Sequence, residues 1–253
     1  MATDTGTDTQ QQLEAMPDDW QRALAVVAHP DDMEYGAAAA VAEWVTAGKD
    51  VSYLLVTRGE AGIDTLEPGE CARVREREQR ASADTVGVTA LDFLDHRDGV
   101  IEEGVPLRRD IAAVVRRLRP ELVITLNYRE TWGGRYWNTP DHRAVGRATF
   151  DAVGDAGNRW IFPEQLESGA LEPWGGVRWV ALAGSSEPTH AVPVGDEAVR
   201  QAVASLAEHR AYITALSDEP VETYARSIVE WGVGMGAERN GGRDCVAFEL
   251  YPR

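Results

Sequence analysis

The sequence predicts an α/β fold in which helices cover both faces of an open, mostly parallel β-sheet. Two observations lead to this prediction. Short apolar runs alternate with longer amphipathic segments through the first half of the 253 residues, and the runs have the length of strands buried on both faces. Strand, helix and strand in repeated succession require right-handed crossovers, which place the helices on both sides of one sheet.

The strands are expected at six short apolar runs. These are residues 23–28, 51–57, 91–95, 122–126, 177–184 and 245–250. In the last run Val246, Phe248 and Leu250 occupy alternate positions, a pattern typical of a strand with one solvated face. This run is therefore expected at an edge of the sheet.

The helices are expected where apolar residues recur three and four positions apart. Ala38, Val41, Ala42 and Val45 follow this spacing, and Gly48 ends the helix. Further helices are expected at residues 71–86, at 111–118, after residue 142 and, as one long helix whose buried seam includes His209, at 197–216.

The chain is expected to form a single domain over residues 19–253, after a disordered tail over residues 1–18. The first residues are mainly Thr, Asp and Gln and offer little to bury. The 43% of hydrophobic residues suffices for one large core. No run approaches the roughly 20 apolar residues of a membrane helix, and no signal peptide begins the chain, so a cytoplasmic protein without membrane insertion is expected.

The charge balance excludes polyanionic partners. Asp and Glu number 42 against 25 Lys and Arg, a formal net charge of −17, so the average field repels nucleic acids. We expect a small-molecule partner, and the sequence is compatible with a homo-oligomer. Cys71 and Cys245 are too few for a disulfide framework.

The first candidate site follows the first strand, where ligands bind in open α/β sheets. His29, Asp31 and Asp32 occupy this turn, whereas a dinucleotide-binding loop would carry several glycines, and the first glycine here is Gly36. A His and a carboxylate three residues apart, on a turn stiffened by Pro30, have the spacing of metal ligands. The alternative is a His that is hydrogen-bonded to an N-capping Asp.

A second motif, WNTPDHRAVG at 137–146, favours the metal site. It follows the fourth strand, and parallel strands end at the same edge of a sheet, so His142 is expected to meet His29 and Asp32. Two imidazoles and one carboxylate leave a coordination position open, as catalytic sites do. Nitrogen and oxygen donors without thiolates suit Zn²⁺, although Fe²⁺ and Co²⁺ accept the same set.

Five short motifs together resemble the PIG-L/LmbE-like metal-dependent deacetylases. In chain order they are AHPDD at 28–32, TRGEAG at 57–62, Arg75 with Glu78, Asp98-Gly99 and PDHRAVG at 140–146. The resemblance spans about residues 22–155. It implies a Rossmann-like three-layer sandwich, zinc held by His29, Asp32 and His142, and Asp31 as general base. It also implies N-acetylglucosaminyl substrates.

The chain departs from the family pattern at Thr139, where many members carry a His expected to polarise the carbonyl or protonate the leaving amine. Tyr136, Asn138 and Arg75 are the candidates to replace that His. All three are also expected to contact the substrate.

Other residues are expected around the ligands. Asp98 and Trp137 border the site and are expected to contact the substrate. Asp141 is expected to orient His142, since metal-bound imidazoles usually donate their second N–H to a carboxylate or carbonyl. Glu60, from the TRGEAG motif, is expected behind the ligands.

The expected function is removal of an N-acetyl or related N-acyl group from an amino-sugar conjugate. A metal-activated water would attack the amide, while Asp31 accepts its proton and returns it to the departing nitrogen. Two alternatives use the same residue types. A non-haem Fe(II) enzyme has the same ligands but usually an all-β scaffold, and an Mg-dependent nucleotide-sugar-binding protein would prefer oxygen ligands.

Overall fold

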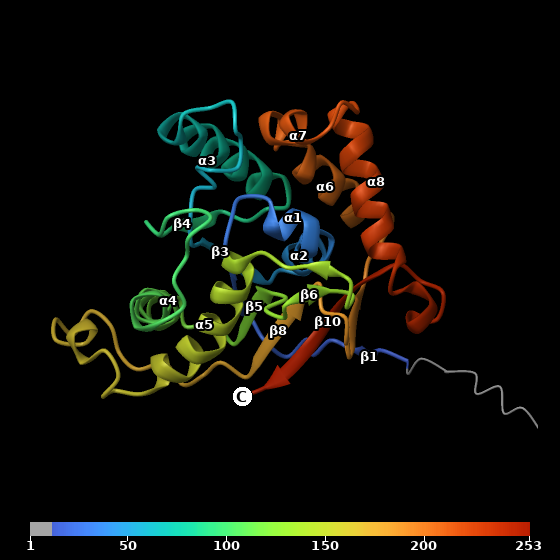
Figure 1. Cartoon of the computed structure of the whole chain (residues 1–253). Coiled ribbons are helices and arrows are strands. Elements are labelled where there is room, and N and C mark those ends of the chain that lie inside the picture. The colour runs from blue at the N-terminus through green and yellow to red at the C-terminus, as the bar shows by residue number, and fades with distance from the viewer. Residues whose placement is uncertain (1–11) are drawn as a thin grey trace, which may run out of the picture.

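The computed structural model describes residues 12–253. Its main sheet has eight strands in the order β1-β9-β10-β8-β5-β2-β3-β4 (Figure 1). Their bounds are β1 Glu14–Ala15, β2 Arg22–Val27, β3 Asp50–Leu55, β4 Ala90–Phe93, β5 Leu122–Leu126, β8 Trp179–Ala183, β9 His190–Pro193 and β10 Cys245–Pro252. Within this sheet only β10 runs antiparallel to its neighbours, so the predicted α/β fold with a mostly parallel sheet is confirmed.

Helices form a layer on each face of the sheet. On one side lie α4 (Val105–Leu118) and α5 (Pro140–Gly157), and on the other lie α2 (Ala38–Thr46), α6 (Asp196–Ala207) and α8 (Val221–Gly234) (Figure 1). The remaining helices are α1 (Asp32–Gly36), α3 (Pro68–Thr85), α7 (Arg210–Leu216) and the 3₁₀ turns η1 (Pro163–Gln165) and η2 (Ala237–Asn240). None of the helices within residues 12–253 has the length and apolar character needed to cross a membrane.

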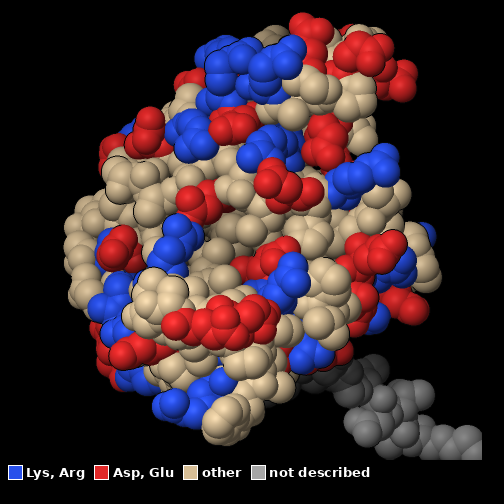
Figure 2. Space-filling model, turned by 90° about the vertical axis from the view of Figure 1, so that its left-hand side faces the viewer, with Lys and Arg blue, Asp and Glu red and all other residues tan. Residues whose placement is uncertain are grey.

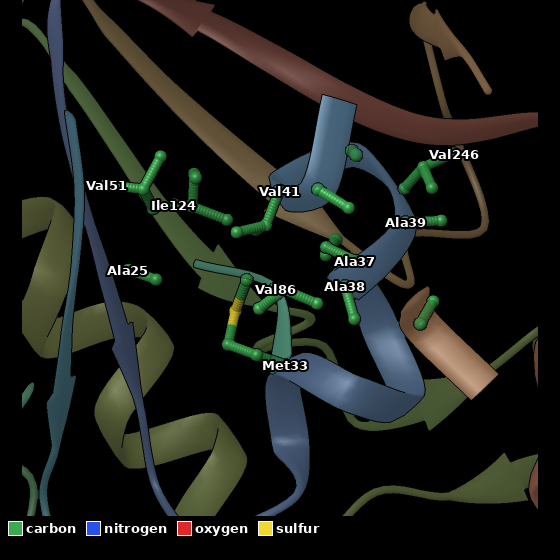
Figure 3. Close-up of a cluster of buried hydrophobic side chains, with 14 of the residues drawn as sticks. Ala25, Met33, Ala37, Ala38, Ala39, Val41, Val51, Val86, Ile124 and Val246 are labelled. Carbon is green, nitrogen blue, oxygen red and sulfur yellow. The ribbon is translucent and has the colours of Figure 1, made fainter. Parts of the chain in front are cut away.

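Alternate residues of β2 enter two separate cores, because both faces of the strand are covered. Val26 packs in the core beneath α4 and α5, whereas Ala25 faces the core beneath α2. Figure 3 shows part of the second core, which includes Ala38 and Val41 of α2 and Ile124 of β5. Small alanines on α2 allow the helix to lie close to the sheet.

The parallel register brings the two sequence motifs to one edge. Val27 lies opposite Leu55 of β3, and Ala25 lies opposite Ile124 of β5. The loop after β2 and the loop after β5 therefore leave the sheet on the same side. The second loop contains a small hairpin, β6 (Thr131–Trp132) and β7 (Tyr136–Trp137), before α5 begins.

Part of the tail expected to be disordered over residues 1–18 is ordered. Glu14–Ala15 forms β1, which pairs in parallel with β9 so that Glu14 lies opposite His190. This pairing uses backbone groups at the free edge of β9 and needs no apolar side chains, which is why composition did not reveal it. Residues 1–11 lie outside the described residues.

The last strand is internal, contrary to the expected edge position. β10 lies between β8 and β9. Val246 and Phe248 are buried in the core beneath α2, and Glu249 on the opposite face is also buried. Glu249 accepts hydrogen bonds from the Arg129 guanidinium at 2.7 and 2.8 Å. The polar residue that alternates with Phe248 and Leu250 is therefore Glu249 in a buried ion pair, and it does not mark a solvated face of the sheet.

The expected long helix over 197–216 is two helices. The helical conformation is interrupted between α6 and α7, and His209 lies at this junction with its side chain fully buried. His209 is thus packed inside the protein, as expected, although it lies at a helix start and not within a helix. The sequence patterns also missed α1, β9 and α8.

Candidate metal centre

The turn after β2 is fixed by the carboxylate of Asp32. Asp32 Oδ2 accepts backbone N–H groups from Ala28 at 2.9 Å and from His29 at 2.8 Å. Asp31 adopts a left-handed conformation with φ 88°, a strained backbone geometry that is enriched at functional sites. This conformation directs Asp31 and Asp32 to different partners, so neighbouring carboxylates take different roles.

His142 is positioned by Asn138 at the start of α5. The Asn138 Nδ2 group donates to the carbonyls of Asn127 at 2.6 Å and Arg129 at 2.9 Å, which leaves Oδ1 facing His142 Nδ1 at 3.1 Å. An amide oxygen can only accept, so His142 carries its proton on Nδ1. Nε2 is therefore the ring nitrogen left to bind a metal, and it lies 3.0 Å from Asp32 Oδ1.

His29 is oriented by two carboxylates from other segments. Its Nε2 lies 3.1 Å from Asp98 Oδ1 and 3.2 Å from Asp141 Oδ2, so Nε2 carries the proton. Nδ1 is therefore the ring nitrogen left to bind a metal, and it lies 3.7 Å from Asp32 Oδ2. Burial opposes protonation, but Asp32, Asp141 and Asp98 outweigh it and raise the pKa of His29 well above its ordinary value.

These three side chains form a donor set that fits a metal ion. One ligand atom each from His29, Asp32 and His142 lies within 4.8 Å of the other two. Burial favours the neutral acid at Asp32, but His142 and His29 outweigh it and hold the pKa of this carboxyl far below its usual range. Two imidazole lone pairs and an ionised carboxylate suit a divalent transition metal.

A second group that satisfies the same distance criterion contains His29, Asp98 and Asp141. Asp141 already accepts the backbone N–H groups of Gly99 at 2.7 Å and Ile101 at 3.1 Å, one on each oxygen. Asp141 therefore serves to fix the loop around residue 99 and the ring of His29. It does not orient His142, contrary to expectation, because Asn138 occupies the Nδ1 side of that ring.

Asp31 lies beside the donor set and is paired with a buried arginine. Its Oδ2 accepts from Arg75 Nη2 at 3.0 Å, and its backbone N–H donates to Gln79 Oε1 at 2.8 Å. Burial raises the pKa of Asp31 to about 6, against the opposing charge of Arg75. A carboxyl with this pKa can exchange a proton near neutral pH.

The guanidinium of Arg75 is enclosed by backbone carbonyls, two glycines and the ring of Tyr212. Its guanidinium donates to the carbonyls of Pro30 at 2.6 Å and Gly59 at 3.2 Å, and it lies 3.9 Å from the ring centroid of Tyr212. A Cβ at Gly59 or Gly62 would come within 2.3 Å of Arg75 Nη1, so both glycines are required. Arg75 is 2% exposed, which suits a residue that positions Asp31.

Sequence reasoning missed a buried polar network behind Asp31. Glu34 Oε1 accepts from Gln79 at 3.0 Å and from Ser82 at 2.8 Å, while Oε2 lies 3.6 Å from His209 Nε2. Gln79 also accepts from the Asp31 backbone, so the network links α1 and α3 to the turn. One signal was available: Gln79 lies four residues after Arg75, on the same face of α3.

The residues expected around the metal ligands differ in whether they line the cavity at the site. Asp98 lines the cavity at the site, and its backbone N–H donates to Glu60 Oε1 at 2.9 Å, which places Glu60 behind it. Tyr136 and Trp137 are 71% and 67% exposed, and of the two only Tyr136 lines the cavity. Asn138 is fully buried and does not line it, so the expected substrate contact is wrong.

The site opens into a cavity of about 1310 Å³. His29, Asp31, Asp32, Asp98 and His142 line one part of it. On the molecular face shown in Figure 2, Lys and Arg gather in small groups flanked by Asp and Glu. This pattern gives no continuous basic surface on that face for a nucleic-acid backbone.

Comparisons with known proteins agree with this geometry. A family model described as PIG-L, GlcNAc-PI de-N-acetylase, matches residues 24–153. A diacetylchitobiose deacetylase from Thermococcus kodakarensis is 30% identical over 180 residues, which cover 70% of this chain and 65% of that protein. A 1D-myo-inositol 2-acetamido-2-deoxy-alpha-D-glucopyranoside deacetylase from Kineococcus radiotolerans is 32% identical over 166 residues, covering 53% of this chain and 45% of that protein. The chain thus spans less than two thirds of the length of these relatives.

The fold is also similar to that of a solved structure. The N,N'-diacetylchitobiose deacetylase from Pyrococcus horikoshii, complexed with its inhibitor MPG, has a TM-score of 0.82 and 22% sequence identity. The superposition covers 92% of this chain and 85% of the other. At this identity the likeness concerns the fold alone.

Proposed function

The chain belongs to the PIG-L, GlcNAc-PI de-N-acetylase, family, and from this premise we propose that it is a zinc-dependent hydrolase that removes the N-acetyl group from an N-acetylglucosamine conjugate. One observation supports the proposal most directly. Asp31, paired with Arg75, lies beside a donor set of His29, Asp32 and His142 without belonging to it. A site with three metal ligands and a separate carboxyl base is suited to amide hydrolysis.

The donor atoms would be His29 Nδ1, His142 Nε2 and the Asp32 carboxylate. When bound, zinc would polarise the amide carbonyl and lower the pKa of a water molecule toward neutrality. The hydrogen bonds of Asn138 to His142, and of Asp98 and Asp141 to His29, fix both rings for this purpose.

Asp31 would move the proton in both halves of the reaction. It accepts a proton from the attacking water as the new C–O bond forms. It then donates that proton to the nitrogen as the C–N bond breaks, which releases acetate and the free amine. Arg75 favours the ionised form of Asp31 at the start of each cycle, because its charge opposes the effect of burial.

The family's additional His has no counterpart in this geometry. Thr139 caps α5 by accepting the His142 backbone N–H at 3.2 Å. Among residues 12–253, His29 and His142 are the only histidines that line the cavity. Asp31 alone is therefore proposed to protonate the leaving amine, and none of Tyr136, Asn138 and Arg75 is needed for that step.

The test is acetate release by the purified protein from N-acetylglucosamine conjugates, with diacetylchitobiose and a GlcNAc-inositol conjugate as first substrates. Activity should disappear after chelation and return with Zn²⁺. Fe²⁺, Co²⁺ and Mg²⁺ are added separately to compare the metals. Acetate release that is indifferent to chelation would contradict a metal-dependent mechanism, and oxygen consumption with Fe²⁺ would favour an oxygenase.

A further inference from the structure

Residues 127–130 connect β5 to the β6–β7 hairpin without helix or strand structure of their own. Both backbone polar groups of Arg129 are nevertheless bound. Its N–H donates to Asn127 Oδ1 at 3.0 Å, and its carbonyl accepts from Asn138 Nδ2 at 2.9 Å. Asn138 is the residue whose Oδ1 faces His142 Nδ1. The conformation of this segment therefore determines where Asn138 presents its oxygen to the His142 ring.

The side chain of Arg129 ties this segment to the last strand. Its two terminal nitrogens donate to the two carboxylate oxygens of Glu249 in β10, 120 residues later in the chain. Glu249 is only 8% exposed and also accepts hydrogen bonds from Ser185 at 2.5 Å and from Tyr251. A planar guanidinium and a carboxylate joined by two hydrogen bonds fix each other's orientation as well as their separation. The segment before the hairpin is thus anchored to β10.

A second ion pair of the same kind lies near the opposite end of α5. Arg108 in α4 donates to both carboxylate oxygens of Asp155 at 2.9 and 2.8 Å. The side chains of this pair are 30% and 9% exposed, against 26% and 11% for Arg129 and Glu249. At 1.5 Å per residue, Asp155 is about 20 Å along α5 from His142. The two pairs therefore match in geometry and burial but differ in their distance from the metal donors.

We propose that Arg129 and Glu249 are positioning residues for the metal ligand His142, acting through the backbone of Arg129 and the amide of Asn138. The inference rests on the metal centre of the proposed function and extends it to β10, which contributes none of the three candidate ligands. Without the ion pair the segment gains conformational freedom, Asn138 loses a fixed acceptor, and its Oδ1 restrains the His142 ring less closely. Metal affinity falls because the ring must then be ordered when the metal binds.

The experiment measures two properties of matched variants. The affinity for Zn²⁺ is determined by competition with a chromophoric chelator, and the free energy of unfolding of the same proteins without metal is determined in urea. Glu249→Gln and Arg129→Met disrupt the pair at β10, and either variant suffices for the test if the other does not fold. Asp155→Asn and Arg108→Met disrupt the comparison pair with the same changes of charge.

Glu249→Gln and Arg129→Met should bind Zn²⁺ about 3-fold to 30-fold more weakly than the native chain, since coupling through hydrogen-bonded residues has effects of this size. Asp155→Asn and Arg108→Met should stay within about twofold of the native affinity, because they are distant from the ligands. All four variants should be less stable than the native chain. A purely structural role of the β10 pair would lower stability and leave the zinc affinity of the folded protein unchanged.

A double-mutant cycle tests the path through Asn138. In the Asn138→Ala background no amide links the Arg129 carbonyl to the His142 ring. Glu249→Gln should then change the zinc affinity by no more than about twofold. A further loss as large as that in the native background would mean that the pair acts by another route, such as its charge, and would overturn the proposal.

The outcomes separate this inference from the proposed function, because zinc affinity is measured without substrate. Equal zinc affinities of Glu249→Gln and Asp155→Asn would overturn the inference, while zinc-dependent acetate release would still support the deacetylase. The expected pattern of affinities without acetate release from any N-acetylglucosamine conjugate would support the inference and contradict the proposed deacetylation. A native chain that binds no Zn²⁺ would overturn the inference.

Discussion

His142 Nδ1 lies 3.1 Å from Asn138 Oδ1, and this contact determines which ring nitrogen faces Asp32. The amide cannot turn over without cost, because its Nδ2 group donates to two backbone carbonyls. The imidazole consequently donates through Nδ1 to Asn138, which leaves Nε2 as its metal-binding atom. A buried asparagine, and not the neighbouring carboxylate of Asp141, prepares His142 to bind a metal.

Replacing Asn138 by alanine should weaken metal binding about 10-fold to 100-fold, since partners of metal-bound imidazoles have effects of this size. The affinity for Zn²⁺ is measured by competition with a chromophoric chelator. Asn158→Ala is the matched control, because Asn158 is exposed at the end of α5 and its side chain caps only Trp160 N–H. Equal zinc affinity in the two variants would show that Asn138 does not position the ligand.

The two adjacent carboxylates should respond differently to the same substitution. Asp31→Asn should retain zinc while lowering kcat about 10²-fold to 10⁴-fold, the usual contribution of a general acid–base group. Asp32→Asn should lose zinc, because it removes the ligand charge, and the single oxygen of asparagine cannot both bind the metal and accept the N–H groups of the turn after β2. Zinc content by elemental analysis and kcat are measured on the same preparations. Loss of zinc from Asp31→Asn would place Asp31 among the ligands and contradict its separate role.

Arg75→Met should destabilise the protein by about 3–5 kcal/mol, because it leaves the buried Asp31 carboxylate without its partner. The control is Arg80→Met on the same helix. Arg80 is half exposed and pairs with Glu76, so its removal should cost at most about 1 kcal/mol. Urea unfolding at neutral pH measures both free energies. Similar losses in the two variants would mean that the Arg75–Asp31 pair contributes no more than a surface ion pair.

The sequence was sufficient to predict the strands and helices whose apolar residues form a continuous run or recur at a regular spacing. The buried runs of β2 and β5 and the amphipathic spacing of α2 and α4 were found, because burial on both faces or on one stripe leaves a local pattern. β1 and β9 were missed because they are short and form through backbone pairing with distant strands. The break before α7 was missed because His209 continues an apolar seam across it.

In the candidate site, too, some features could be predicted from the sequence and others could not. The association of the two sequence motifs could be expected, since both follow parallel strands. The partners of each ring could not, because they depend on loop conformation: Asp141 turns toward His29, and Asn138 takes the position beside His142. No pattern in the sequence marked Glu34, which in the fold meets Gln79 and Ser82 in the interior.

Glu249 provides a test of how pH affects stability at a distance from the metal donors. Burial opposes ionisation of this carboxyl, but hydrogen bonds from Arg129, Ser185 and Tyr251 outweigh it and hold its pKa below the ordinary value of 4.5. A carboxyl whose pKa is lowered by folding stabilises the protein above its unfolded pKa. That contribution is lost as the pH falls through the folded value.

Glu249→Gln should therefore lower the free energy of unfolding by about 1.5–3 kcal/mol near pH 7, the range for hydrogen bonds to charged groups, and by progressively less as the pH falls below about 4.5. Glu187→Gln is a matched control, because Glu187 contacts the same Arg129 at 3.1 Å but is 70% exposed. Its effect should stay within about 1 kcal/mol at every pH. Urea unfolding of the three proteins across this range measures the differences. A Glu249→Gln difference that stays constant from neutral to acidic pH would contradict a stabilising role for the ionised carboxylate, since a packing effect of the substitution would not titrate.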